Sequence, residues 1–404
     1  MDIPLLFTTR IVRLFCYGFL SVILALYLAE AGLTETQIGL LFTLTLIGDA
    51  VISLWLTTSA DRWGRKKTLL VGALLMAGAG IGFVLTKNYF LLMLAAIFGV
   101  ISPSGNEIGP FLSVEQASLT QLISNEKRTH FFAWYNLAGS FATATGALVS
   151  GWLAQSFQLS GSTTLESYRF VLIGYALGGV ILLLLFANLS SNIEVATPHA
   201  VRSTKYSLGL HRSRNVVFKL SALFALDAFA GGLIVQSLLA YWFHVRFGAD
   251  IALLGSIFFG ANILAGISAL LAVRIANKFG LVNTMVFTHI PSNILLMLVP
   301  LMPTLPLAIG ILLIRFSISQ MDVPTRQSYT MAVVAPDERS AASGVTAIAR
   351  SVGASLSPVL TGLFFAIPAL LSAPFFISGG LKIVYDLLLF REFRAVKPPE
   401  ETSK

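Results

Sequence analysis

The sequence predicts an all-α integral membrane protein with twelve transmembrane helices in two pseudo-symmetric six-helix bundles. Three observations support this prediction: the apolar composition, the distribution of Lys and Arg, and an internal repeat. Of the 404 residues, 56% are hydrophobic and 11% are charged, whereas soluble domains carry about 25% charged residues. Apolar stretches of about 20 residues, the length that crosses a bilayer as a helix, recur along the whole chain.

Twelve such stretches can be placed in order. The first follows Arg10 and Arg13. Because no clear cleavage site follows it and the same pattern recurs downstream, we interpret it as a transmembrane helix and not as a signal peptide. The fourth, fifth, tenth and eleventh contain polar residues with Pro or Gly. The predicted spans are 11–29, 37–58, 68–86, 89–112, 130–155, 169–189, 217–243, 251–273, 281–301, 305–328, 340–366 and 370–390.

The basic residues favour one side of the membrane. With the N-terminus in the cytoplasm, twenty Lys and Arg fall in cytoplasmic segments and three in external loops. Cytoplasmic loops carry an excess of Lys and Arg, so both termini are expected to be cytoplasmic. This distribution accounts for the net charge of +8 without a nucleic-acid partner. The external three are Lys87, Arg169 and Arg246.

The two halves of the chain repeat each other weakly. ADRWG at residues 60–64 matches ANKFG at 276–280, and NEKR at 125–128 matches PDER at 336–339. Matches in the same order at nearly constant spacing predict a duplicated six-helix unit. The predicted organisation is an N-terminal bundle over residues 1–189, a cytoplasmic linker over 190–215 and a C-terminal bundle over 216–404.

A motif between the second and third predicted spans resembles a family signature. Residues 57–67 read TTSADRWGRKK, which is similar to the G-x-x-x-D-R-x-G-R-R/K motif of the major facilitator superfamily, with Thr57 in place of the first glycine. With the span count and the long linker, the resemblance covers nearly the whole chain. It implies the fold of that superfamily and a cytoplasmic latch between the halves. The expected gating residues are Asp61, Arg62, Gly64, Arg65 and Lys66.

Charged residues inside the predicted spans are candidates for a transport site, because charge in hydrocarbon usually faces a partner or a watery cavity. Four of these charged residues lie about ten residues from a span end, near mid-depth: Asp49, Asp227, Arg315 and Arg350. In the family that the motif resembles, spans one, four, seven and ten line the cavity, which favours Glu107, Asp227 and Arg315. The predicted substrate- and proton-binding residues are Glu107, Asp227, Arg315, Arg350 and Asp49.

These residues allow more than one role. Glu107 or Asp227 could take a proton from one side and release it to the other, or could form buried ion pairs with an arginine. Arg315 and Arg350 could hold an anionic group of a substrate. Two further pairs, four residues apart, are expected to pair along one helix face. They are Asp322 with Arg326, and Lys382 with Asp386.

The fourth span has an unusual end. ISPSGNEIGPFLSVEQ, residues 101–116, contains Glu107 and Glu115 among prolines and glycines. Broken helices at membrane depth are tolerated where they line a cavity. We therefore expect the helix to bend around Glu107, with that carboxylate facing water.

The expected function is secondary transport of a small organic solute by alternating access, as a proton-coupled antiporter for efflux across a bacterial inner membrane. The expected partners are a small-molecule substrate, with basic cavity residues favouring an anionic group, protons and the lipid bilayer. Gly139, Gly146 and Gly151 in the fifth span fit both the exporters of that family and plain close packing. Ala147 stands where those exporters carry Pro.

Other functions remain open. An importer or a uniporter would differ in the direction of transport under a pH gradient, and a non-transporting receptor or scaffold would tolerate neutral substitutions at Glu107 and Asp227. The sequence shows no phosphate-binding loop, zinc-ligand spacing or nucleophile–base arrangement, so an enzyme is disfavoured and no cofactor is expected. Cys16 is the only cysteine, which excludes an intrachain disulfide.

Overall fold

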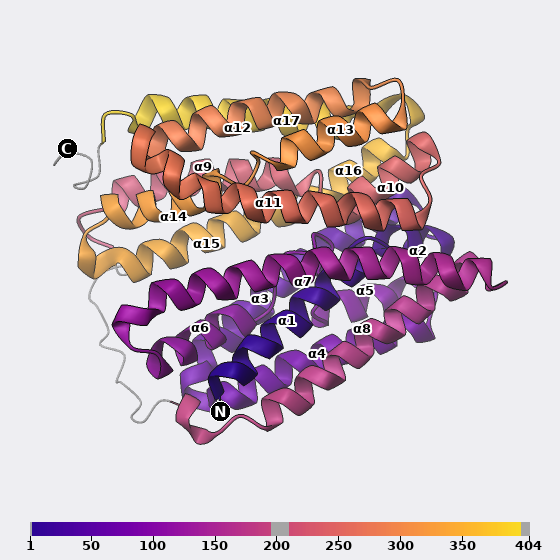
Figure 1. Cartoon of the computed structure of the whole chain (residues 1–404), viewed down its shortest axis with the longest axis horizontal. Helices are drawn as coiled ribbons and strands as arrows, with labels where there is room; N and C mark the ends of the chain where they lie inside the picture. Colours follow the sequence, from indigo (N-terminus) through magenta and orange to yellow (C-terminus); the bar gives the residue numbers. More distant parts are fainter. Residues whose placement is uncertain (1, 195–209, 397–404) are drawn as a thin grey trace. The chain divides into compact units, whose positions relative to one another are not determined.

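A computed structural model describes residues 2–194 and 210–396, and every regular element within them is a helix (Figure 1). Ten helical stretches in this part are long and apolar enough to cross a membrane. The shorter apolar helices α5 (Tyr89–Phe98) and α13 (Leu305–Phe316) begin where the fourth and tenth spans are predicted. Together they account for the twelve predicted positions. Residues 195–209 of the predicted linker lie outside the described residues.

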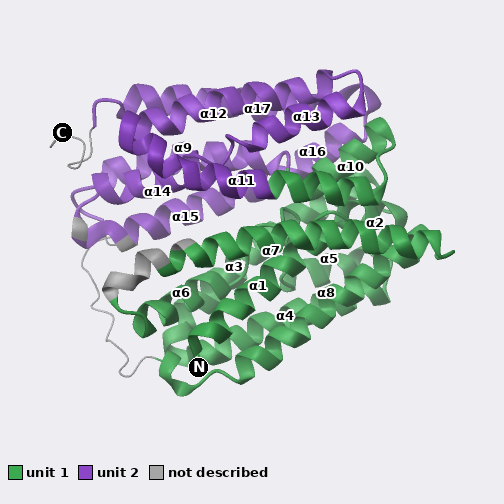
Figure 2. Ribbon diagram, viewed as in Figure 1, with its two compact units in different colours: residues 1–200, 235–262 green, residues 201–234, 263–404 purple. Residues whose placement is uncertain are grey.

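The chain divides into two compact units (Figure 2), residues 1–200 with 235–262, and residues 201–234 with 263–404. Unit 1 contains α1 (Asp2–Ser21), α2 (Leu24–Glu30), α3 (Glu35–Trp63), α4 (Arg65–Leu85), α5, α6 (Phe111–Leu122), α7 (Asn125–Leu159), α8 (Thr164–Ala187), η1 (Ser191–Ile193), α10 (Gln236–Phe247) and the start of α11 (Ile251–Phe279). Unit 2 contains α9 (Arg214–Gly232), the rest of α11, α12 (Leu281–Leu298), η3 (Val299–Leu301), α13, α14 (Asp322–Val333), η4 (Pro336–Glu338), α15 (Arg339–Ser355), α16 (Pro358–Phe365), η5 (Pro368–Leu370) and α17 (Ala373–Phe393).

Spans seven and eight are therefore shared between the units. Helix α9 belongs to unit 2, but its continuation α10 and the first part of α11 belong to unit 1. The predicted boundaries of the two sequence bundles, at residues 189 and 216, stay a prediction.

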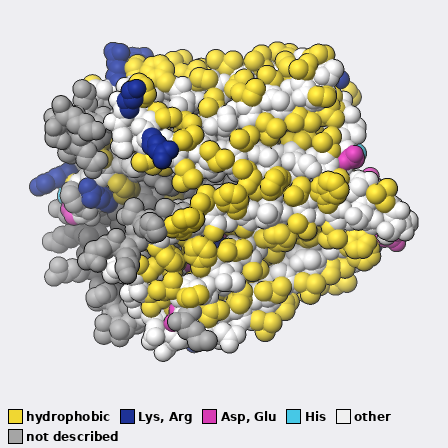
Figure 3. Space-filling view, in the orientation of Figure 1, with side chains coloured by type: hydrophobic (Ala, Val, Ile, Leu, Met, Phe, Trp, Pro, Cys, Tyr) yellow, Lys and Arg dark blue, Asp and Glu magenta, His cyan; other side chains and the backbone are white. Residues whose placement is uncertain are grey.

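The outer surfaces of the helices are apolar. On the face shown in Figure 3, hydrophobic side chains cover most of the helical surface, and the visible Lys and Arg side chains lie near helix ends. Exposed apolar side chains include Trp55, Phe90, Trp134 and Trp152. Large exposed apolar surfaces mark interaction with a membrane or a partner, and here they lie on helices of membrane-spanning length.

The loops that carry the repeated ADRWG and ANKFG sequences fold alike. Gly64, between α3 and α4, has φ +104°, and Gly280, between α11 and α12, has φ +87°. Residues with a Cβ rarely adopt this backbone conformation, so both positions require glycine. In each loop a threonine four residues later donates its hydroxyl to the glycine carbonyl, Thr68 at 3.1 Å and Thr284 at 2.7 Å. The weak sequence match thus marks a local structural repeat.

Carboxylates hold both described ends of the linker region. In unit 1, Glu194 accepts the backbone N–H groups of Arg65 and Lys66 at 2.7 and 3.1 Å, at the N-terminus of α4. In unit 2, Glu338 accepts the backbone N–H groups of residues 211–213, two of them at 2.8 Å. Helix N-termini leave such donors unpaired and favour negative charge.

Five predicted spans are interrupted. The first, fourth, seventh, tenth and eleventh are each divided into two helices. The widest break is in span four, where helix ends at Phe98 and resumes at Phe111, so the expected bend is a complete interruption. Gly105 and Gly109, at φ +71° and +80°, allow the chain to turn there.

Candidate functional site

The break in span four is held by side chains from other helices of unit 1. Asp49 of α3 accepts the backbone N–H of Gly109 at 2.8 Å. Tyr17 of α1 donates to the carbonyl of Ile108 at 3.2 Å. Non-helical backbone at membrane depth needs such replacement partners. The predicted site residue Asp49 therefore lies at the break, where it orders the chain beside Glu107.

Helix α10 supplies further partners to this break. Ser237 donates its backbone N–H and its hydroxyl to the carbonyl of Pro103, at 3.0 and 2.7 Å. The same hydroxyl also lies 2.7 Å from the carbonyl of Ser21. Gln236 donates to the Ser21 hydroxyl at 2.7 Å. These contacts explain why α10 belongs to unit 1.

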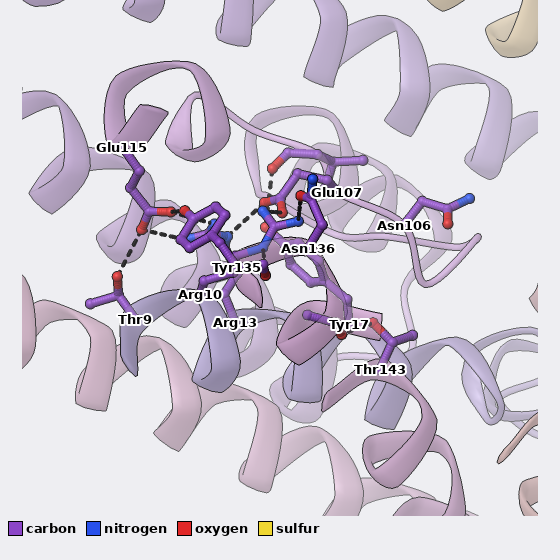
Figure 4. A network of polar contacts seen from close by, with 12 residues as sticks. Thr9, Arg10, Arg13, Tyr17, Asn106, Glu107, Glu115, Tyr135, Asn136 and Thr143 are labelled. Atoms are coloured by element: carbon purple, nitrogen blue, oxygen red, sulfur yellow. Dashed lines mark hydrogen bonds and ion pairs between the residues drawn. The ribbon is translucent and has the colours of Figure 1, made fainter. Parts of the chain in front are cut away.

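Glu107 and Glu115 bind arginines of α1, and they share one of them, Arg13 (Figure 4). Arg13 donates to both oxygens of Glu115, at 2.7 and 2.8 Å, and through Nε to Glu107 at 2.7 Å. Arg10 donates to the other oxygen of Glu107 at 2.8 Å. The Arg13 and Glu115 side chains are fully buried, whereas 15% of the Glu107 side chain is exposed. Two cations and two carboxylates thus form one network, in which the Glu107 side chain is the most exposed.

Thr9, Tyr135 and Asn136 make further contacts with this network. Thr9 donates its hydroxyl to Glu115 at 2.8 Å, and Tyr135 of α7 donates to the same carboxylate. The Arg10 guanidinium carbon lies 4.3 Å from the centre of the Tyr135 ring, and Arg10 also donates to Asn136 at 3.2 Å. A buried charge that is fully paired and hydrogen-bonded costs little to keep buried. Glu115 is therefore a fixed member of the network.

A second network in unit 2 surrounds Asp227 of α9. Its Oδ1 accepts Lys382 of α17 at 2.6 Å, and its Oδ2 accepts Arg326 of α14 and Arg350 of α15, both at 3.1 Å. The Asp227 side chain is 5% exposed. The structure thus brings together two of the predicted site residues, Asp227 and Arg350, and adds two cations to them.

The expected pairing of Lys382 with Asp386 along α17 is wrong. Lys382 bonds to Asp227, while Asp386 accepts from Asn293 at 3.1 Å and lies 2.9 Å from Nδ1 of His289, both on α12. The two residues share a helix but reach different neighbours. The other expected pair, Asp322 with Arg326, forms at 2.9 Å.

Arg315 does not join the Asp227 network. It lies in the last turn of α13, its guanidinium carbon is 5.0 Å from the centre of the Phe316 ring, and its Nε has no hydrogen-bond partner among the described residues. A role for Arg315 in binding stays a prediction.

The expected gating residues lie around Gly64. The Asp61 side chain is 63% exposed and pairs with Arg65 at 2.9 Å. Arg65 also donates to Gln121 of α6 at 3.0 Å, and Lys66 donates to the carbonyl of Leu189 at 2.7 Å. Arg62 is exposed. These contacts lie within unit 1, and the gating role stays a prediction.

Sequence reasoning missed Arg10 and Arg13, which it assigned to the cytoplasmic flank of the first span. In the structure α1 begins at Asp2, so both arginines lie inside the helix. Their spacing of three places them on one helix face, and this was the available signal. Lys382 was expected to pair with Asp386, yet it contacts Asp227, a predicted site residue.

The glycines of α7 serve close packing. A Cβ at Gly146 would lie 2.0 Å from the carbonyl oxygen of Phe15 on α1, and a Cβ at Gly151 would lie 2.4 Å from that of Ile251 on α11. Helices that approach so closely need small residues. The packing interpretation is thereby sufficient, and these glycines carry no argument about the direction of transport.

A family model described as the Major Facilitator Superfamily matches residues 6–358. An uncharacterized membrane protein of Saccharomyces cerevisiae is 32% identical over 427 residues, covering 98% of this chain and 94% of that protein. The quinolone resistance protein NorA of Staphylococcus aureus is 31% identical over 85 residues, which cover 21% of this chain and 22% of NorA.

Solved structures with similar folds include transporters of different solutes. A variant of the nucleoside transporter NupG has a TM-score of 0.78 at 17% identity, covering 96% of this chain and 99% of its own. The D-xylose–proton symporter has a TM-score of 0.75 at 15% identity, covering 99% and 98%. A bacterial homologue of the human lysosomal transporter Spinster has a TM-score of 0.74 at 15% identity, covering 97% and 96%. The predicted fold class is confirmed.

Proposed function

Because the chain belongs to the major facilitator superfamily, whose fold it shares with known secondary transporters, we propose that it exports a small organic solute by alternating access in exchange for protons. The chain is a multi-pass membrane protein, and its family is one of transporters and not of enzymes. The coupling to protons, the direction and the solute belong to the proposal.

The observation that carries proton coupling is the environment of Glu107. Its carboxylate lies at a break in a membrane span, is partly exposed, and is held by two arginines that each have other partners. Protonation of Glu107 would therefore leave Arg13 paired with Glu115, and Arg10 hydrogen-bonded to the Tyr135 carbonyl and to Asn136. Ionisable groups in such positions mark proton relays in transporters. The Glu115 side chain has no exposed surface, so we assign the proton to Glu107.

Export is supported by the likeness of 85 residues to NorA, a resistance protein. The same fold also serves a symporter and a nucleoside transporter, so the fold alone does not set direction. We further propose that both termini are cytoplasmic, from the distribution of Lys and Arg, and that Asp61 and the basic residues after it latch the cytoplasmic side. Residence in a bacterial inner membrane stays a prediction.

The proposal is tested with purified protein in liposomes that contain a pH-sensitive dye. An acidic lumen is imposed, and drugs, organic acids, sugars and metal chelates are added one at a time. One class of compound should accelerate proton loss from the lumen and accumulate inside, as expected for exchange. Glu107→Gln should abolish this coupling, whereas Glu392→Gln, which removes an exposed ion pair with Lys219, should not.

Other outcomes contradict parts of the proposal. Solute uptake without proton movement would identify a uniporter, and movement of solute and protons in the same direction would identify a symporter. Folded protein that moves no compound of the panel would favour a receptor. Glu107→Gln with unchanged coupling would remove this residue from the proton path.

A further inference from the structure

Arg350 differs from the other cations around Asp227 in its exposure. Its side chain is 36% exposed, compared with 7% for Arg326 and 11% for Lys382. Within the described residues its single hydrogen bond runs from Nη1 to Oδ2 of Asp227 at 3.1 Å. A guanidinium carries five N–H donors in a planar fork, so most donors of Arg350 have no partner in the part of the chain that the structure describes.

The depth of Arg350 makes this exposure informative. It lies eleven residues after Arg339, the first residue of α15, which is about 16 Å along the helix axis. A charge at that depth of a membrane span faces water, a partner or a ligand, because contact with lipid is too costly. Ser343 and Ala347, on the same face of α15, are small and exposed. They leave the guanidinium accessible from that side.

Asp227 can release Arg350 and remain paired. Lys382 holds its Oδ1 at 2.6 Å, and Arg326 holds its Oδ2 at 3.1 Å. Arg326 is itself paired with Asp322. Removal of a sole partner from a buried charge is strongly destabilising, but Asp227 has three partners. Of these, Arg350 is the most exposed and therefore the easiest to exchange for another ligand.

The backbone beside Arg350 is fixed. A Cβ at Gly353 would lie 2.2 Å from the carbonyl oxygen of Ala225 on α9, and a Cβ at Gly232 of α9 would lie 2.5 Å from the carbonyl oxygen of Ala354 on α15. Packing this close holds α15 against α9, so exchange of partners needs only a change in the Arg350 side chain.

We propose that Arg350 binds a carboxylate or phosphate group of the transported solute, which replaces Asp227 as the partner of its guanidinium. The planar fork matches two oxygens of either group. This inference rests on the proposed transport function and assigns its substrate to the organic anions. Asp227 positions the guanidinium while the site is empty and stays neutralised by Lys382 and Arg326 when the anion is bound.

The test labels an introduced cysteine. The single native cysteine, Cys16, is buried, so the native chain should not react and serves as the unlabelled control. The variant Ala347→Cys places a thiol one turn from Arg350. Its rate of reaction is measured by intact mass with two methanethiosulfonate reagents, the anionic sulfonatoethyl and the cationic trimethylammonium-ethyl compound. The anionic reagent should be favoured. Arg350→Gln in this background should lower the ratio of the two rates by about five- to tenfold, and Arg339→Gln, the same loss of charge farther along α15, should leave it nearly unchanged.

A second measurement tests whether Arg350 binds an anion through its planar fork and not through charge alone. Inorganic phosphate and benzoate should slow labelling at residue 347 in nanodiscs of phosphatidylcholine, and Arg350→Lys should keep the preference for the anionic reagent but lose this protection. Protection that appears only when phosphatidylglycerol is added would assign the site to a lipid headgroup and overturn the proposal. No reaction with either reagent, an unchanged ratio in Arg350→Gln, or no protection by either anion would also overturn it. The labelling rates do not depend on transport. The anion site can therefore be disproved while proton-coupled export holds, and proton-coupled export can be disproved while the anion site holds.

Discussion

Glu107 and Glu115 bind the same arginine but differ in what surrounds them. We expect Glu115→Gln to destabilise the protein by about 2–3 kcal/mol, because the fully buried Arg13 loses its two-oxygen partner and keeps only its Nε contact with Glu107. Glu107→Gln should cost about 1 kcal/mol, since Arg13 keeps Glu115, and Arg10 keeps Tyr135 and Asn136. Thermal and denaturant unfolding of both variants in detergent measures the difference. Equal losses would show that the exposure of Glu107 has no energetic meaning.

Glu338 makes stability depend on acid. Burial raises the pKa of this carboxyl, but hydrogen bonds from Ser213, His211 and Arg212 outweigh burial and lower it from 4.5 to about 2. A pKa below its unfolded value gives stability that is complete above about pH 4.5 and is lost as the pH falls toward 2. The native protein should exceed Glu338→Gln in melting temperature at neutral pH, and this advantage should shrink below pH 4.5. An advantage that is constant from pH 7 to 3 would contradict the assignment.

At the scale of single residues, the sequence identified charges that stand out at depth, such as Glu107 and Asp227. It could not identify Arg10 and Arg13 as their neighbours, because basic residues before an apolar stretch ordinarily mark its cytoplasmic end. It also could not separate Arg350 from Arg315. Which arginine meets Asp227 depends on how α9 and α15 pack.

Among the helices, the break in span four gives Asp49 a role that can be distinguished from proton binding. Its carboxylate accepts the Gly109 N–H and the Ser53 hydroxyl. Asp49→Asn retains an acceptor oxygen and should therefore keep proton-coupled transport. Asp49→Leu should lose both transport and stability, because the Gly109 N–H is left without a partner. Transport that fails in Asp49→Asn at unchanged melting temperature would instead place Asp49 in the proton path.

The sequence predicted the position of this break better than its extent. Pro and Gly show where helical hydrogen bonds are absent or weak, but not which side chains replace them. The partners of residues 99–110 come from α1, α3, α8 and α10. No local pattern contains that information. Where no such break occurs, as in span nine, the predicted residues 281–301 agree with α12 and η3.

For the whole molecule, the proposed alternating access would require residues 235–262, which belong to unit 1, to change neighbours. Gly151 and Gly255 bring the backbones of α7 and α11 together, and a Cβ at Gly255 would lie 2.8 Å from the carbonyl oxygen of Ala147. Gly255→Leu should separate these helices and slow transport. In this background, Ser256→Cys should react faster with a water-soluble maleimide, because the contact with Trp152 is lost. Gly310→Leu on α13, where a Cβ meets open space, is the matched control, and equal labelling in both would contradict the requirement.

The duplicated architecture could be predicted from the sequence because the repeated loops keep their glycines. The membership of α10 in unit 1 could not, because it depends on contacts between Ser237 and residues more than a hundred positions earlier, such as Pro103. Contacts that bridge the two sequence halves leave no mark in either half alone.

Those contacts also set an order of events during synthesis. The carbonyls of Ser21 and Pro103 emerge from the ribosome long before Ser237, which supplies their hydrogen bonds. At about 5–20 residues per second, the roughly 40 residues from Glu194 to Ser237 need about 2–9 s to be synthesised. Throughout that interval the nascent break in span four lies in the membrane with unpaired carbonyls. A chain stalled or cleaved near residue 200 would lack Ser237, so these carbonyls would stay without that donor.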